Sequence, residues 1–173
     1  IEENHRLLQE AAHNLKLTNP AELAAKTAAL AAELKAAERK LEELEAKLAQ
    51  SRLGELLGSA RPVGSLRLVT AALEGAKPDT LRSMGDQAKA NAADLVAVLA
   101  GVADGKVSLL VACGPQAVAA GAHAGKLVKE LTALAGGSGG GRPDSAMGGI
   151  TQPEKLEAAL AKAPELLQAM LKI

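Results

Sequence analysis

Hydrophobic residues recur every three or four positions along the first fifty residues, which is the spacing of one face of an α-helix. A first stripe predicts a helix that ends near Leu17, and its members are Ile1, His5, Leu8, Ala12 and Leu15. The segment Thr18-Asn19-Pro20-Ala21-Glu22 then supplies a capping residue, a proline for the first helical position and an early acid. These signals predict a second helix from Pro20 to Gln50.

The stripe on the second helix keeps a heptad step without a slip, while Lys, Glu and Arg fill the outer positions. A long helix with one apolar stripe needs a partner, either the first helix folded back as a hairpin or a second copy of the chain. A solvated spacer packed on its neighbour and a dimer seam both fit the pattern. The leucines expected to pack against another helix are Leu23, Leu30, Leu34, Leu41, Leu44 and Leu48.

The pattern changes after Ser51, where glycines and a proline mark a boundary before a new domain. The first elements predicted beyond it are a strand over 65–71 and a helix that begins at Pro78. Strands over 94–100 and 107–112 follow, joined by a tight turn at Asp104-Gly105. A helix is predicted over 119–135, and a last helix starts with a capping box at Thr151 and is interrupted at Pro164. This order predicts an α+β chain with a helical segment over residues 1–52 and a small globular domain with a mixed sheet and packed helices over 53–173.

Five of the six residues from Gly136 to Gly141 are glycine, and Arg142, Pro143 and Asp144 follow. Such a run fits a flexible linker, a phosphate-binding loop or a shaped backbone segment. Nucleotide-binding loops follow a strand, whereas this run follows a predicted helix, so Gly136 is expected to cap that helix. We therefore predict that the run crosses the sheet as a glycine-kinked strand.

Charge and composition restrict the possible partners. Lys and Arg number 20 and Asp and Glu number 20, so any contact with nucleic acid must come from a local patch. The aromatic content is 0%, which excludes recognition of bases by stacking on aromatic side chains. No apolar run approaches the ~20 residues of a membrane span. A single cysteine indicates a reducing compartment, the cytoplasm, and a start at Ile1 suggests a piece of a longer protein.

The histidines and the cysteine offer no metal site or nucleophile, because their spacings are not those of ligand sets. Cys113 is expected to be a small core residue, and His5, His13 and His123 are expected at the surface. His123, Lys126 and Lys129 are spaced by three and share one helix face. That face is either a solvated surface or a contact for an anionic partner.

The segment GKLVKELTALAGGSGGGRPDSAMGG, preceded by VADGKVSLLVA and PDTLRSMGDQAKA, resembles the DHH-associated domain at the C-terminus of alanyl-tRNA synthetases. The capped helix NPAELAAKTAALAAELKAAERKLEELEAKLA resembles the linking helices of that family. The resemblance implies a C-terminal piece of an enzyme that joins alanine to its tRNA using ATP. It also implies that the ligation site and the zinc-dependent editing site lie upstream, so this piece is expected to hold no catalytic centre, ATP or zinc.

The resemblance further implies binding to the outer corner of tRNA(Ala), tethering of the two activities, and dimerisation. Related DHH phosphoesterases carry a histidine where this chain has Arg142, which favours the synthetase branch, and the pattern also departs at Ser145 and Met147. We predict phosphate contacts from Lys126, Lys129, Gly139, Gly140, Gly141 and Arg142. The alternatives are a coiled-coil assembly module without RNA binding and the substrate-binding domain of a DHH phosphoesterase.

Overall fold

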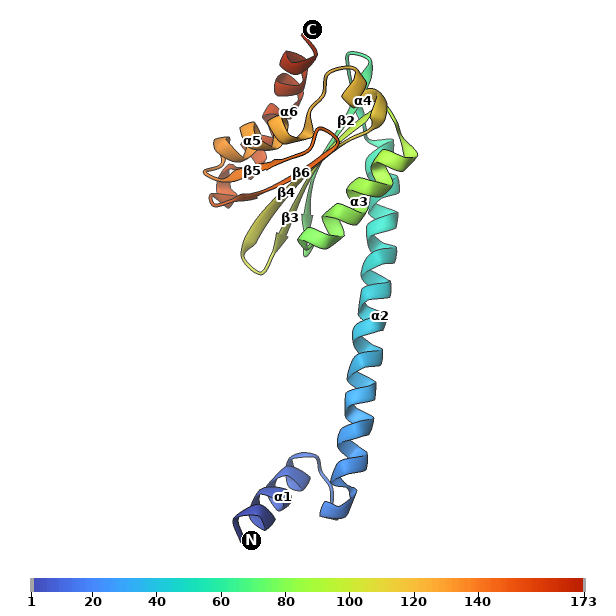
Figure 1. Ribbon diagram of the computed structural model, residues 1–173, viewed down its shortest axis with the longest axis vertical. Coiled ribbons are helices and arrows are strands. Elements are labelled where there is room, and N and C mark those ends of the chain that lie inside the picture. The colour runs from blue at the N-terminus through green and yellow to red at the C-terminus, as the bar shows by residue number, and fades with distance from the viewer. Residues whose placement is uncertain (1, 173) are drawn as a thin grey trace. The chain divides into compact units, whose positions relative to one another are not determined.

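The computed structural model describes residues 2–172, so Ile1 of the first predicted stripe lies outside the described residues. The chain divides into two compact units, Ile1–Lys47 and Leu48–Ile173, where the sequence predicted a boundary after residue 52. Figure 1 shows the helices and strands in chain order. None of the helices in the described part of the chain combines the length and the apolar character that crossing a membrane requires.

The first unit is helical, as predicted. It contains α1 (Glu2–Asn14), the short 3-10 helix η1 (Pro20–Glu22) and the beginning of α2 (Leu23–Gly58). Asn19 caps η1, because its side-chain oxygen accepts a hydrogen bond from the amide of Ala21 at 3.0 Å.

Helix α2 ends at Gly58 and not near Gln50, so the expected end was wrong by eight residues. Gly54 lies inside the helix, at a cost of about 1 kcal/mol relative to alanine. Leu53 is buried in the core of the second unit, and Leu56 and Leu57 pack beside it. The burial of these leucines offsets the free-energy cost of Gly54, so the helix continues beyond the glycine to Gly58.

The leucine stripe of α2 is largely uncovered within the described residues. Helix α1 has 13 residues and α2 has 36, so α1 can cover about a third of the length of α2 at about 1.5 Å of rise per residue. Leu34, Leu41, Leu44 and Leu48 are between 51% and 62% exposed. Leu23 and Leu30 are partly buried.

The second unit is built on a six-stranded mixed sheet, which confirms the α+β class. The strand order is β1 (Arg61–Val63), β2 (Leu66–Glu74), β3 (Leu95–Ala103), β4 (Lys106–Cys113), β6 (Ser145–Ile150) and β5 (Ser138–Gly141). Among the strands of residues 2–172, only β2 and β3 pair in parallel, and helix α3 (Pro78–Asn91) connects them. The predicted hairpin between β3 and β4 is present, with Asp104 and Gly105 both at positive φ, as a two-residue turn of this type requires.

Both faces of the sheet are covered by apolar clusters. Helix α5 (Ala124–Leu134) and α6 (Leu156–Leu171) contribute to a cluster that contains Leu127, Leu131 and Leu167. Helix α3 and the end of α2 contribute to the opposite cluster through Leu81, Met84 and Leu53. Central strand β3 has seven consecutive buried residues, as expected for a strand covered on both faces.

Two predicted helices differ from the structure. The helix expected over 119–135 begins later, as α5 at Ala124, and the separate helix α4 (Pro115–Ala119) precedes it, because Gly121 adopts a positive φ of 112° between them. The expected capping box at Thr151 is absent: the Thr151 hydroxyl donates to the carbonyl oxygen of Gly136, and η2 (Pro153–Lys155) precedes α6. Helix α6 also continues through Pro164 without the expected interruption.

Candidate nucleic-acid interface

The glycine run forms the outermost strand of the sheet. Strand β5 pairs antiparallel with β6, and the turn at Arg142-Pro143-Asp144 joins them. The predicted strand is therefore present, but it lies at the edge of the sheet and does not cross it. An edge strand leaves one side of its backbone without a strand partner.

The start of the run ends α5, as the sequence predicted for Gly136. Gly136 has φ of 70°, and its amide donates to the carbonyl of Ala133 at 3.4 Å. The amide of Gly137 donates to the carbonyl of Thr132 at 2.7 Å. These two bonds form a Schellman motif, which satisfies the last carbonyls of α5 and turns the chain into β5.

Most glycines of the hairpin are required by close packing. A Cβ on Gly139 would lie 2.8 Å from the Cα of Gly148 and 3.1 Å from a methyl group of Val128 on α5. A Cβ on Gly141 would lie 2.6 Å from the Cα of Ala146. Gly140 differs from these neighbours, because a Cβ there would meet nothing within 4 Å.

The amides of the predicted phosphate-binding glycines point in alternate directions. The amide of Arg142 donates to the carbonyl of Ser145 at 3.0 Å, which fixes the alternation of the β5–β6 ladder. The amide of Gly140 therefore points toward β6, and the amides of Gly139 and Gly141 point away from it. Two of the three predicted donors consequently face the outer edge of the sheet.

The N-terminus of α5 is already occupied by protein groups. The amide of Ala124 donates to the carbonyl of Pro143 at 2.9 Å, and the amide of Gly125 donates to the carbonyl of Arg142 at 3.2 Å. The amide of Lys126 donates to Nδ1 of His123 at 3.2 Å, so His123 is the N-cap of the helix. The helix therefore holds the turn in place and does not offer these amides to an anion.

The basic residues predicted to contact phosphate are all at the surface. Lys126 and Lys129 are exposed on α5, and the side chain of Arg142 is 78% exposed. The hydrogen bond between Gly125 and Arg142 brings the turn beside the first turn of α5, where Lys126 lies. The structure thus gathers Arg142 and Lys126 at one end of the hairpin, with Lys129 one turn further along α5.

An ion-pair network that the sequence analysis did not identify ties this turn to α3. The ammonium of Lys89 lies 3.1 Å from Asp86 and 3.2 Å from Asp144, and Asp144 lies 3.3 Å from Arg142. Burial lowers the pKa of Lys89, but hydrogen bonds to both carboxylates outweigh it and the net pKa is raised. The hydrogen bond from Lys89 holds the pKa of Asp144 below its ordinary value.

Arg82 is a second cation near the hairpin that the sequence analysis missed. It lines the same hollow as Gly140 and Arg142. Its spacing of three from Asp79 is typical of a solvated helix face, and nothing in the spacing shows that β5 lies nearby. Only the sheet order brings α3 and the glycine strand to one site.

Cys113 and the histidines take the structural positions that the sequence predicted. Cys113 is 1% exposed, and burial raises the pKa of its thiol to about 12. His5 and His13 are exposed on α1, and His123 is a partly exposed cap. Within residues 2–172, no three His, Cys, Asp or Glu side chains are grouped so that they could hold a metal ion.

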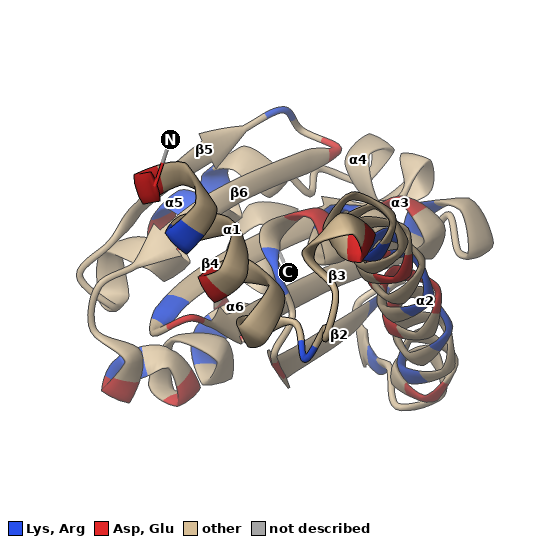
Figure 2. Ribbon diagram, turned by 90° about the horizontal axis from the view of Figure 1, so that it is seen from below, with Lys and Arg blue, Asp and Glu red and all other residues tan. Residues whose placement is uncertain are grey.

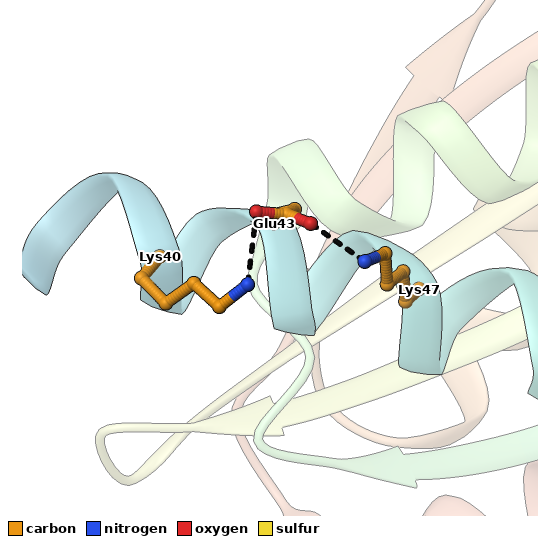
Figure 3. A network of polar contacts seen from close by, with 3 residues as sticks. All are labelled: Lys40, Glu43 and Lys47. Atoms are coloured by element: carbon orange, nitrogen blue, oxygen red, sulfur yellow. Dashed lines mark hydrogen bonds and ion pairs between the residues drawn. The ribbon is translucent and has the colours of Figure 1, made fainter.

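Helix α2 carries interspersed charges of both signs along its length (Figure 2). Glu43 lies 3.3 Å from Lys40 and 2.6 Å from Lys47, one helical turn to either side (Figure 3). The hydrogen bond from Lys47, followed by that from Lys40, lowers the pKa of Glu43. Such ion pairs stabilise a helix whose surface is exposed to solvent. They lie outside the leucine stripe, which contains no charged side chains.

The sequence is similar to a set of curated ligases. It is 38% identical over 165 residues to an alanine–tRNA ligase of Bacillus pumilus, and this match covers 95% of the chain and 19% of the relative. It is 42% identical over 161 residues to an alanine–tRNA ligase of Latilactobacillus sakei, with 93% of the chain and 18% of the relative covered. The chain therefore spans about a fifth of the length of the curated relatives that it matches.

The fold is similar to that of two solved structures. The C-Ala domain of Aquifex aeolicus alanyl-tRNA synthetase superimposes with a TM-score of 0.58 and 25% identity, over 62% of this chain and 96% of that domain. RecJ from Thermus thermophilus, solved in complex with Mg²⁺, superimposes with a TM-score of 0.52 and 19% identity, over 92% of this chain and 23% of RecJ, which shows a shared fold.

The model of the DHHA1 domain matches residues 65–169, which is more than half of the chain. This range includes α3, the β3–β4 hairpin, α5 and the glycine hairpin. The chain belongs to the DHHA1 domain family and, within that family, matches the C-terminal region of alanyl-tRNA synthetases.

Proposed function

We propose that this chain is a tRNA-binding and domain-tethering module of an alanine–tRNA ligase, and that it supports aminoacylation and editing of tRNA(Ala). The observation that carries the proposal is the match to alanine–tRNA ligases over 95% of the chain, together with the likeness to a C-Ala domain. The partner is tRNA(Ala), and the compartment is the cytoplasm. ATP and zinc are assigned to other parts of the ligase, so this module contributes binding and no catalytic centre.

The glycine hairpin is the proposed RNA contact. Lys126, Lys129 and Arg142 are exposed around the end of the hairpin, where their charges can reach phosphates. The amides of Gly139 and Gly141, directed at the sheet edge, can add hydrogen bonds to phosphate oxygens. Without aromatic side chains this contact depends on charge and shape, so we expect a weak affinity that is sensitive to salt, with a shallow slope because few phosphates are contacted.

The test is to measure tRNA binding by fluorescence anisotropy for wild type, Arg142→Ala and Lys126→Ala. We expect each variant to bind several-fold more weakly and with a shallower dependence on salt. Lys162→Ala, which removes an exposed lysine of α6, is the matched control and should bind as wild type does. Unchanged affinity in both hairpin variants would reject this surface.

Tethering is proposed for the helical segment. Helix α2 is one continuous helix of 36 residues, on the order of 54 Å long at about 1.5 Å per residue. A continuous helix is a stiffer connection than a glycine-rich or serine-rich linker. Shortening it by one heptad within the parent ligase should therefore reduce editing or aminoacylation while leaving tRNA binding by the isolated module unchanged.

Assembly is the second candidate function, and the uncovered leucine stripe favours it. Leu34, Leu41 and Leu44 are each more than half exposed at heptad spacing, which is the pattern of a helix that pairs with a second copy. Sedimentation over a range of concentrations tests this candidate. A chain that stays monomeric at high concentration excludes a strong dimer seam, whereas dimerisation that is lost in Leu41→Lys supports one.

A further inference from the structure

A shallow hollow of about 370 Å³ opens beside the glycine hairpin, on the α3 side of the sheet. Three segments line it: helix α3, the end of β5 with the turn that follows, and strand β6. The residues that matter for its chemistry are Arg82, Asp86, Gly140, Arg142, Ser145 and Met147. Two guanidinium groups, a hydroxyl and bare backbone therefore line one site.

The glycine at position 140 is not explained by the fold. A Cβ there would meet nothing within 4 Å, and Gly140 is not among the residues at positive φ. Its neighbour Gly139 is packed against Gly148 and Val128 and has no such freedom. A glycine that packing does not require leaves the backbone open to the close approach of a ligand.

The charges around the hollow can be rearranged at low cost. Arg82 lies 2.9 Å from Asp79, and Arg142 lies 3.3 Å from Asp144, with both arginine side chains more than 60% exposed. Exposed ion pairs contribute little to stability, so a ligand that offers better acceptors can replace these carboxylates. A phosphate accepts paired hydrogen bonds from a guanidinium group and is such a ligand.

The acidic residue in the hollow shares a cation with the acid of the turn. Asp86 lies 3.1 Å from the ammonium of Lys89, which is 19% exposed and also holds Asp144. The ammonium balances one of the two carboxylate charges, so one negative charge remains beside the two arginines. The same ammonium also fixes the base of the turn that carries Arg142.

We propose that this hollow is a two-arginine site for one backbone phosphate of RNA. Arg82 approaches the phosphate from α3, Arg142 approaches it from the turn, and the sugar–phosphate chain lies against Gly140. The site rests on the proposed binding of tRNA and adds a contact on the α3 side of the hairpin to the one proposed for Lys126 and Lys129 on α5. It adds Arg82 to the contact and assigns Gly140 a role distinct from that of its neighbours.

A double-mutant cycle tests whether the two arginines share a phosphate. Binding of tRNA is measured at several salt concentrations for Arg82→Ala, Arg142→Ala and the double variant. Each single change should weaken binding about five- to tenfold, and the double change should weaken it by clearly less than the product of the two. The slope of log affinity against log salt should fall by about one in the double variant, whereas two separate phosphates would lower it by about two.

Arg61→Ala is the matched control for charge, because Arg61 is exposed on β1 at the opposite edge of the same sheet. It should bind as wild type does. Wild-type protein that fails to bind tRNA would overturn the proposed function and this site together. Wild-type binding with unchanged affinity in Arg82→Ala would overturn this site alone.

Gly140→Val separates binding from folding. It places a branched side chain over the proposed path of the RNA, so we expect at least a tenfold loss of affinity with no loss of thermal stability. Gly54→Val is the control, because a Cβ at Gly54 also meets nothing within 4 Å and that residue lies on α2. Normal binding by Gly140→Val would overturn the site.

The same assay identifies the source of the phosphate. A mononucleotide and a short oligonucleotide are added as competitors of labelled tRNA. Weak competition by both supports an RNA backbone contact embedded in a larger interface. Competition at concentrations close to that of unlabelled tRNA would overturn the assignment to folded RNA in favour of a nucleotide pocket.

Discussion

The ammonium of Lys89 on α3 lies 3.2 Å from the carboxylate of Asp144, which is 55 residues later in the chain. This pair connects a helix on one face of the sheet to the turn of the edge hairpin. The carbonyl of Asp144 also accepts a hydrogen bond from the amide of Cys113 at 2.9 Å. Asp144 thus fixes the turn through both its side chain and its backbone.

Lys89→Met should destabilise the second unit by about 1 kcal/mol, because it leaves Asp86 and Asp144 without their shared cation. Chemical denaturation at neutral pH measures the change. Lys89→Arg keeps the charge and should recover part of the loss. Equal losses in both variants would show that the packing of the lysine stem, and not its charge, is what matters.

The same pair predicts a dependence on acid. The pKa of Asp144 is lowered in the folded state from its ordinary value of 3.8, chiefly by Lys89. A lowered carboxyl pKa contributes stability that is fully present above the ordinary value and is lost as pH falls through the folded pKa. The stability difference between wild type and Asp144→Asn should therefore be constant from pH 7 to about pH 5 and shrink below about pH 4. A constant difference down to pH 2 would contradict the lowered pKa.

Two adjacent glycines should respond oppositely to alanine. Gly139→Ala forces a methyl group to within 2.8 Å of the Cα of Gly148 and should cost about 1–3 kcal/mol. Gly140→Ala adds a methyl group in open space and should stabilise by about 0.5–1 kcal/mol through reduced freedom of the unfolded chain. Thermal unfolding of the two variants beside wild type measures both effects. Similar losses in both would show that the strand packs more uniformly than the structure indicates.

The regular elements of the second unit could be predicted because their signals are local. The turn at Asp104-Gly105 identifies the β3–β4 hairpin by residue type alone, and Pro78 marks the start of α3. Gly136 was likewise identified as a helix cap, since its positive φ is a property of a single residue. Each of these features depends on residues that are neighbours in the chain.

The errors arose where distant contacts override local signals. Gly54 looks like a boundary, yet Leu53 and its neighbours are buried against the sheet and the helix continues. Thr151 has the sequence of a capping residue, yet its hydroxyl bonds to Gly136, which arrives from the end of another helix. Neither partner can be identified from the neighbouring sequence.

The candidate site was predicted in part for the same reason. Arg142 and the glycines are adjacent in the sequence and were found together, whereas Arg82 and Lys89 join them only through the strand order β4-β6-β5. The distinct position of Gly140 also depends on the ladder, because the register decides which face each glycine occupies. The roles of these residues in binding RNA stay predictions.

Cys113 should be inert toward thiol reagents in the folded protein. It is 1% exposed and its pKa is raised to about 12, so almost no thiolate is present at pH 8. Alkylation by iodoacetamide should therefore proceed only through unfolding and accelerate with denaturant in proportion to the unfolded fraction. Rapid labelling of the native protein would show that β4 opens locally. Cys113→Ala should retain the fold at a modest cost in packing.

Pro164→Ala should stabilise the second unit. Pro164 lies inside α6 without an amide proton, so the carbonyl of Leu160 loses its helical partner. Alanine restores this bond and removes the ring clash, which should raise the free energy of unfolding by up to about 3 kcal/mol. The greater conformational freedom of the unfolded chain should lower it by about 0.4–1 kcal/mol. The net rise should be visible as a higher thermal midpoint, with Glu165→Ala as the exposed control at the next position. A lower midpoint for Pro164→Ala would mean that the proline shapes a bend on which the packing of Leu167 depends.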